Sequence, residues 1–214
     1  MKVEIYDSGA EALRNFDVVI FDFDGVIIDS NIVKEKTFQR VFHNLNAEQN
    51  AYVSAYHHDN LGVPRSEKIA HLYRYFYEKE IAAQALNQLC LRFSEVSLRE
   101  LSSRQYLISD TISFVREIHS QKRLYVASAA SEDDVIYLCK KHNINQFFEA
   151  TFGSPQSKIA LVENICGKNL GDKICLVGDS IHDFLAADAN GVDFYAYNNA
   201  SLIGVYPYIR AFAK

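Results

Sequence analysis

The segment Asp22-Phe23-Asp24-Gly25 places two carboxylates at the end of an apolar run. Residues i and i+2 of an extended strand point to the same face, so the two aspartate side chains are expected to lie close together. Adjacent carboxylates repel each other unless a cation or a shared proton lies between them. Oxygen ligands of this kind suit a hard divalent cation such as Mg²⁺. The alternative is an acidic turn, for which Asp-Gly is a common signal.

A second acidic pair, Asp179 and Asp183, follows the apolar run Ile174 to Val177 and opens a predicted helix. Residues four apart share one face of a helix. Acidic side chains at a helix start can simply interact with the helix dipole. Two of them at the end of a buried strand also indicate a metal site.

Two further polar residues occupy comparable places. Ser128 comes directly after the apolar run Leu124 to Ala127, and small residues follow it, so its hydroxyl and nearby backbone N–H groups could bind an oxyanion. A helix N-cap is the alternative. Lys158 opens another predicted helix, where a cation could neutralise a bound anion. A solvated surface lysine is the alternative there.

The elements that must position these residues form an alternating pattern. Four apolar runs predict strands, and a helical pattern over 133–142 lies between the second and the third. A run that is apolar throughout is typical of a strand buried on both faces, as in a parallel sheet. The sequence therefore predicts an α/β fold. The stretch 1–15 precedes the first of these strands and is unexplained by this pattern, although 3–6 could add an edge strand.

From Asn31 to about Arg104 nearly every segment has helical periodicity, with breaks near 44–50 and 60–64. We therefore predict a core domain made of residues 1–29 and 105–214, and an inserted helical domain of residues 30–104. The insert would cover the carboxyl ends of the strands, where open α/β sheets bind ligands.

Composition excludes several classes of protein. The chain has 214 residues, with 22 basic and 27 acidic side chains and a net charge of −5, so no nucleic-acid partner is expected. No apolar run approaches the ~18 residues of a membrane span, and the N-terminus lacks the apolar block of a signal peptide. We expect a cytoplasmic monomer or homodimer without a membrane partner. Its four cysteines have no metal-site spacing and are expected to be free thiols.

The order of these signals resembles the four motifs of the haloacid dehalogenase (HAD) superfamily, over the span from Asp17 to Gly191. The helical insert is similar to the cap of its phosphoglycolate phosphatase and β-phosphoglucomutase branch. Ala129 and Ile159 depart mildly from the usual motifs. The resemblance implies a Rossmann-like parallel sheet with an all-helical cap subdomain.

The resemblance also implies a role for each motif residue. Asp22 would be the nucleophile and Asp24 the general acid and base, which needs a carboxyl group that keeps its proton near neutral pH. Ser128 and the Ala129 N–H would bind the phosphoryl oxygens, and Lys158 would neutralise charge. Mg²⁺ would be held by the side chains of Asp22 and Asp179 and the backbone carbonyl of Asp24, with Asp183 orienting a metal-bound water or supporting Lys158.

These roles describe a Mg²⁺-dependent phosphatase that acts on a small phosphorylated metabolite through an aspartyl-phosphate. Dehalogenation at carbon needs neither Asp24 nor a metal. Two alternatives stay open: a phosphomutase of the β-phosphoglucomutase type, and a non-catalytic phospho-acceptor or binding module. Arg65 could bind a second anionic group or sugar hydroxyls, or could lie on the surface at a helix start. The segment Tyr56 to Lys68 resembles bacterial HAD proteins of surface-polysaccharide sugar pathways, which suggests a sugar phosphate.

Overall fold

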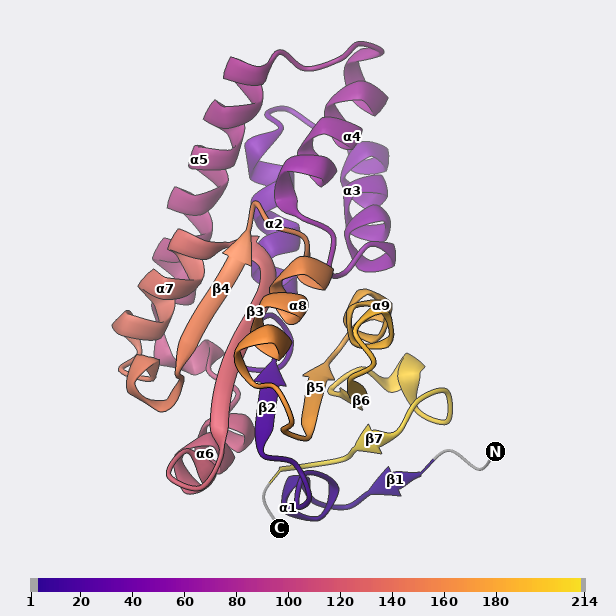
Figure 1. Cartoon of the computed structure of the whole chain (residues 1–214). Coiled ribbons are helices and arrows are strands. Elements are labelled where there is room, and N and C mark those ends of the chain that lie inside the picture. The colour runs from indigo at the N-terminus through magenta and orange to yellow at the C-terminus, as the bar shows by residue number, and fades with distance from the viewer. Residues whose placement is uncertain (1–3, 213–214) are drawn as a thin grey trace.

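The computed structural model describes residues 4–212 (Figure 1). Seven strands alternate with helices, and all the pairings between these strands are parallel. The strands are β1 (Ile5–Tyr6), β2 (Val18–Phe21), β3 (Arg123–Ser131), β4 (Ala150–Ser154), β5 (Ile174–Gly178), β6 (Asp193–Tyr197) and β7 (Tyr208–Ile209). The helices that pack on the sheet are α1 (Gly9–Ala12), α6 (Ser109–Ile118), α7 (Glu132–Lys141), α8 (Lys158–Lys168) and α9 (Ile181–Ala189).

The sheet has the strand order β1-β7-β6-β5-β2-β3-β4. The chain leaves β2, continues to β3 and β4 on one side, and then returns to β5 on the other side of β2. The strand order thus reverses at β2. In an open parallel sheet this reversal leaves a crevice at the carboxyl ends of the strands, where ligands bind. The turn that carries Asp22 and Asp24 begins at this point.

Both faces of the central strand are buried, which explains the continuous apolar run in the sequence. Val19 and Phe21 pack in one core layer with α6 and α7, whereas Val18 and Ile20 pack in the opposite layer with α8 and α9. Side chains alternate between the two faces of a strand, so both layers need apolar residues from β2. The result is a three-layer α/β fold that confirms the predicted fold class.

Four consecutive helices stand over the carboxyl ends of β2, β3 and β4 (Figure 1). They are α2 (Asn31–Val41), α3 (Ala47–Asp59), α4 (Arg65–Tyr77) and α5 (Ala83–Leu101). Their apolar faces enclose a core cluster of their own, formed by Phe38, Val41, Phe42, Val53, Ile69, Leu72 and Phe93. We call this group of helices the cap. The predicted domain boundaries at 29/30 and 104/105 stay a prediction.

The sequence predicts some of the outer strands of the sheet and misses others. The expected edge strand over 3–6 is present as β1, at the edge beside β7, with Val3 outside the described residues. The sequence pattern missed β4 and β7, which are short or only partly apolar.

Within 4–212 no helix combines the length and the hydropathy that a bilayer crossing would need.

Candidate active site

Asp22 is the first residue after β2 and is almost fully buried. Its Oδ1 accepts a hydrogen bond from the Phe23 N–H at 2.7 Å and lies 2.7 Å from the Lys158 ammonium nitrogen. Its Oδ2 has no hydrogen-bond partner within residues 4–212. One oxygen is therefore fixed by two donors while the other stays available to a ligand. This is a geometry that suits a nucleophile.

Three carboxylates gather at this edge of the sheet. One oxygen from each of Asp22, Asp179 and Asp183 lies within 4.8 Å of the other two, and all three residues are buried. Burial, followed by the charge of Asp183, raises the pKa of Asp22 to about 7 although Lys158 opposes the shift. Burial and the charge of Asp22 raise the pKa of Asp179 well above its usual range. Concentrated, poorly solvated carboxylate oxygens fit a hard divalent cation, which would relieve their repulsion.

Lys158 is the internal cation of this cluster. Its ammonium group contacts Asp22 and donates a hydrogen bond to Asp183 Oδ1. Burial disfavours the charged form, but Asp183 and Asp22 outweigh it and raise the pKa of Lys158. The lysine is therefore buried and charged, not the solvated surface residue that was the alternative.

Asp183 also makes hydrogen bonds at the start of α9. Its Oδ2 accepts hydrogen bonds from the backbone N–H and the hydroxyl of Ser180, which in turn caps the helix. Asp179 precedes α9 instead of lying on it. The prediction that both acids share one helical face is therefore wrong, and a loop brings them together. Asp183 supports Lys158 and the helix start while only one of its oxygens faces the cluster.

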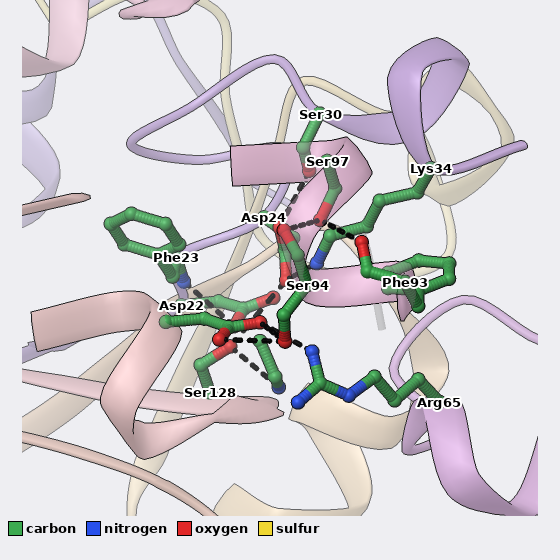
Figure 2. A network of polar contacts seen from close by, with 12 residues as sticks. Asp22, Phe23, Asp24, Ser30, Lys34, Arg65, Phe93, Ser94, Ser97 and Ser128 are labelled. Carbon is green, nitrogen blue, oxygen red and sulfur yellow. Dashed lines mark hydrogen bonds and ion pairs between the residues drawn. The ribbon is translucent and has the colours of Figure 1, made fainter. Parts of the chain in front are cut away.

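Asp24 lies beside Ser30 and Lys34, at the start of the cap (Figure 2). Its Oδ2 lies 2.5 Å from the ammonium nitrogen of Lys34, and its Oδ1 accepts a hydrogen bond from the Ser30 hydroxyl at 2.5 Å. Burial tends to raise the pKa of Asp24, but Lys34 and Ser30 outweigh burial, and the pKa is lowered. The expected protonated carboxyl group is therefore not found in the free protein. The reason is Lys34, a cap residue whose position ten residues downstream gave no signal in the sequence.

Ser128 lies within β3 and not after it, because β3 continues to Ser131 with a register shift against β4 after Ala127. The buried Ser128 hydroxyl oxygen accepts a hydrogen bond from the Ala130 N–H at 3.0 Å and lies 3.5 Å from Asp24 Oδ2. Ala129 lines the same cavity as Asp22 and Lys158. The structure thus places Ser128 beside Asp24 and Ala129 on the cavity wall, and their role in binding phosphate stays a prediction.

Arg65 begins α4 and lines the cavity, but its guanidinium group forms an ion pair with Asp134 of α7. Asp134 also accepts hydrogen bonds from the Ser94 hydroxyl of α5 at 2.9 Å. This cluster connects the cap to the helix that follows β3. Arg65 is therefore partly buried in an ion pair, and its role as a substrate-binding residue stays a prediction.

Several residues that shape the site carry no recognisable sequence signal. The side-chain amides of Asn198 and Asn199 donate hydrogen bonds to the backbone carbonyls of Gly25 and Asp179, at 2.9 and 2.7 Å. These bonds hold the two acidic turns side by side. Lys68 and His57 of the cap are buried and line the cavity above them.

Gly25 is the point at which the two acidic turns touch. Its φ is +75°, and a Cβ added there would lie 1.9 Å from Asp179 Oδ2. We expect Gly25→Ala to displace the Asp179 carboxylate and to lower the free energy of unfolding by more than the ~1–2 kcal/mol that a positive φ alone costs. Stabilisation by Mg²⁺ should also be lost. Urea unfolding with Mg²⁺ and with EDTA measures both effects.

Gly171→Ala is the matched control, because Gly171 has a φ of +87° but no atom within 4 Å of the added Cβ. It should show the backbone cost alone and keep its response to Mg²⁺. Equal losses of stability and of Mg²⁺ response in the two variants would contradict a specific contact between Gly25 and Asp179.

Comparison with known proteins agrees with this geometry. Residues 19–197 match the model of the haloacid dehalogenase-like hydrolase family. No curated protein sequence matches the chain.

Similar solved structures share the fold at low sequence identity. A haloacid dehalogenase-like hydrolase from Streptococcus pneumoniae has a TM-score of 0.67 at 17% identity, over 92% of this chain and 94% of that one. A predicted phosphoglycolate phosphatase from Haemophilus somnus has a TM-score of 0.65 at 20% identity, over 86% and 85% of the two chains. The β-phosphoglucomutase of Clostridium difficile has a TM-score of 0.69 at 13% identity, over 92% and 91%.

The family match covers most of the chain, includes both acidic turns and Lys158, and confirms the resemblance carried by the motifs. The protein belongs to the haloacid dehalogenase-like hydrolase family.

Proposed function

We propose that the protein is a Mg²⁺-dependent phosphatase that hydrolyses a small phosphomonoester through an aspartyl-phosphate on Asp22. One observation carries the proposal. Asp22 is buried beside two other carboxylates, and one of its oxygens is held by Lys158 and the Phe23 N–H while the other makes no hydrogen bond within 4–212. A fixed carboxylate next to a buried ammonium group is suited to attack an electrophilic phosphorus whose charge the site can neutralise.

The reaction has two steps. In the first, Asp22 Oδ2 forms a bond to phosphorus, the bond from phosphorus to the ester oxygen breaks, and that oxygen takes a proton from Asp24 to leave as an alcohol. In the second, Asp24 takes a proton from water while the water oxygen attacks phosphorus. The acyl-phosphate bond then breaks, and Asp22 is regenerated with release of inorganic phosphate.

The ion pair between Asp24 and Lys34 suits the second step directly, since it keeps Asp24 as a carboxylate that can accept a proton. The first step needs Asp24 protonated. A bound phosphoryl group supplies negative charge beside Asp24 and competes for Lys34, and both effects raise the pKa of Asp24. Lys34 therefore couples the protonation of Asp24 to occupancy of the site.

The residues present fit a magnesium ion. The carboxylates of Asp22 and Asp179 and the backbone carbonyl of Asp24 would hold it. The ion would supply charge neutralisation for a phosphoryl group at the site. Lys158 would act on the same charge from the side of α8 and would keep Asp22 aligned.

The cavity supports a small substrate. It is lined by Asp22 and Lys158 at the edge of the sheet and by residues of the cap, and a concave site between two such parts suits a small molecule. Its apolar walls include Phe38 and Phe93 of the cap. A sugar phosphate is the substrate class that we propose.

Phosphate release from a panel of phosphorylated sugars and small acids, with Mg²⁺ and with EDTA, tests the proposal. We expect turnover with Mg²⁺ and a fall of about 10³-fold or more with EDTA, because the metal contributes several kcal/mol to the transition state. Unchanged turnover in EDTA would contradict the proposed dependence on Mg²⁺. No release, with conversion between isomeric sugar phosphates upon addition of a bisphosphate, would indicate a phosphomutase. No reaction of either kind in folded protein would favour a phospho-acceptor.

A further inference from the structure

Lys68 is a buried cation without an acidic partner. It lies on α4 with 3% of its surface exposed, and no carboxylate of residues 4–212 lies within 4 Å of its ammonium nitrogen. Its one polar contact is His57 Nδ1 at 3.3 Å, and the Phe38 ring lies 5.8 Å from the nitrogen. A buried lysine is ordinarily paired with an acid, because desolvation of an unpaired charge is costly.

The other cations of the cap that line this cavity are already paired. Lys34 contacts Asp24, and Arg65 contacts Asp134. Burial and then repulsion by Lys34 lower the pKa of Lys68 to about 7, and the more distant Asp24 and Asp179 offset the shift only in part. Among these cap residues, Lys68 is thus the one whose charge an anionic ligand could neutralise.

The polar neighbour of Lys68 in the cap is His57. It is also 3% exposed, and its buried Nε2 has no hydrogen-bond partner. Burial and the charges of Lys68 and Lys34 lower the pKa of His57 to about 3, so the ring is neutral. With Nδ1 facing the Lys68 ammonium group as acceptor, the proton of the ring resides on Nε2, which is then a donor. His57 Nδ1 thus accepts one hydrogen bond from Lys68, no carboxylate of residues 4–212 takes the other N–H groups of the ammonium, and the Nε2–H bond of His57 points to the opposite side of the ring.

We propose that Lys68, which His57 holds in position, forms a second anion-binding subsite for a carboxylate or a second phosphate on the substrate whose phosphomonoester binds at Asp22. This inference rests on the proposed function and specifies its substrate class. Both residues line the one cavity that also contains Asp22 and Lys158, so a single molecule can span the two positions. The anion would supply the acidic partner that Lys68 lacks.

Two matched substrate pairs test the subsite. 3-Phosphoglycerate differs from glycerol 3-phosphate by a carboxylate in place of a hydroxymethyl group, and glucose 1,6-bisphosphate differs from glucose 6-phosphate by a second phosphate. Wild-type protein should have a lower KM for the member with the second anion in at least one pair, which identifies the group. Lys68→Met should raise that KM about 10- to 100-fold with little change in kcat, and should leave the other member unaffected.

Two further variants serve as controls for the effect of the positive charge at Lys68. Lys68→Arg keeps the charge and should restore much of the preference. Lys36→Met removes an exposed lysine from α2 and should change nothing. Equal effects of Lys68→Met on both members of each pair, or a wild type without preference in either pair, would overturn the subsite.

Binding to Asp22→Asn protein separates this inference from the proposed function. Calorimetric titration of the same four compounds, with and without Lys68→Met, reports the subsite without turnover. A Lys68-dependent preference in binding, with no phosphate release by wild type, would support the subsite and contradict the phosphatase. Phosphate release by wild type without a Lys68-dependent preference in binding would support the phosphatase and contradict the subsite. Absence of binding by all four compounds would overturn the subsite.

Discussion

Asp22→Asn is expected to lower phosphate release by about 10⁴-fold or more while the protein stays folded. Asparagine has nearly the same shape but cannot form the bond to phosphorus, and the loss of a nucleophile typically costs several orders of magnitude in kcat. Single-turnover and steady-state assays of phosphate release with Mg²⁺ measure the loss.

The same substitution should not lower stability in EDTA. The pKa of Asp22 is raised to about 7, mainly by burial and Asp183, so the folded state holds this proton more tightly than the unfolded state. Ionisation of Asp22 therefore lowers the free energy of unfolding as pH rises from about 4 to 7. Asparagine removes that effect, and urea unfolding at pH 8 should show a variant at least as stable as wild type.

Asp188→Asn, which neutralises an exposed carboxylate on α9, is the control and should keep both activity and the wild-type pH dependence of stability. Residual release above about 1% of wild type in Asp22→Asn, after exclusion of deamidation by mass spectrometry, would contradict the nucleophile assignment.

Lys158→Met is expected to lower the free energy of unfolding by about 3–5 kcal/mol near neutral pH. The substitution leaves Asp22, Asp179 and Asp183 within 4.8 Å of one another with no ammonium group among them. Phosphate release should fall by about 10²–10³-fold or more, since a positioned donor at the reacting charge is lost. Urea unfolding and steady-state assays measure the two effects.

Two conditions should restore part of this stability. Burial and mutual repulsion already raise the pKa values of Asp22 and Asp179, and loss of Lys158, which opposes the shift, raises them further. The folded state then binds more protons than the unfolded state, so stability of the variant should rise as pH falls from 7.5 to 5. Mg²⁺ should also stabilise the variant, because it supplies positive charge to the same carboxylates.

Lys140→Met removes an exposed lysine from α7 and should leave stability within about 0.5 kcal/mol of wild type. If Lys158→Met were equally stable at pH 5 and 7.5 and insensitive to Mg²⁺, Lys158 would not be the cation that balances the carboxylate cluster.

The sequence by itself determined the parallel α/β sheet and the family. A strand buried on both faces must be apolar at every position, and Val18 to Phe21 shows this without ambiguity. The carboxyl ends of parallel strands share one edge of the sheet, so Asp22 and Asp179 had to approach each other. Order along the chain was sufficient for these conclusions because the topology of such sheets has few alternatives.

The roles of the cap lysines depended on the tertiary structure. Helical periodicity predicts an apolar face but does not show which lysine at its margin is buried, since a long side chain can reach solvent or a cavity from the same position. Lys34 therefore gave no sign that it would contact Asp24 and lower its pKa. Lys68 gave no sign that it would be enclosed without an acid.

The same limit applies to Arg65 and Asp183. The sequence placed Arg65 in a loop near the site, but only the packing of α4 and α5 against α7 supplied Asp134 as its partner. Asp183 was recognised as an acid of the site, yet its share in the cap of α9 and its bond to Lys158 required the positions of both helices. The alternation of strands and helices and the positions of the motifs follow from local patterns in the sequence. The pairing of charges between the cap and the sheet follows from long-range packing, which no local pattern encodes.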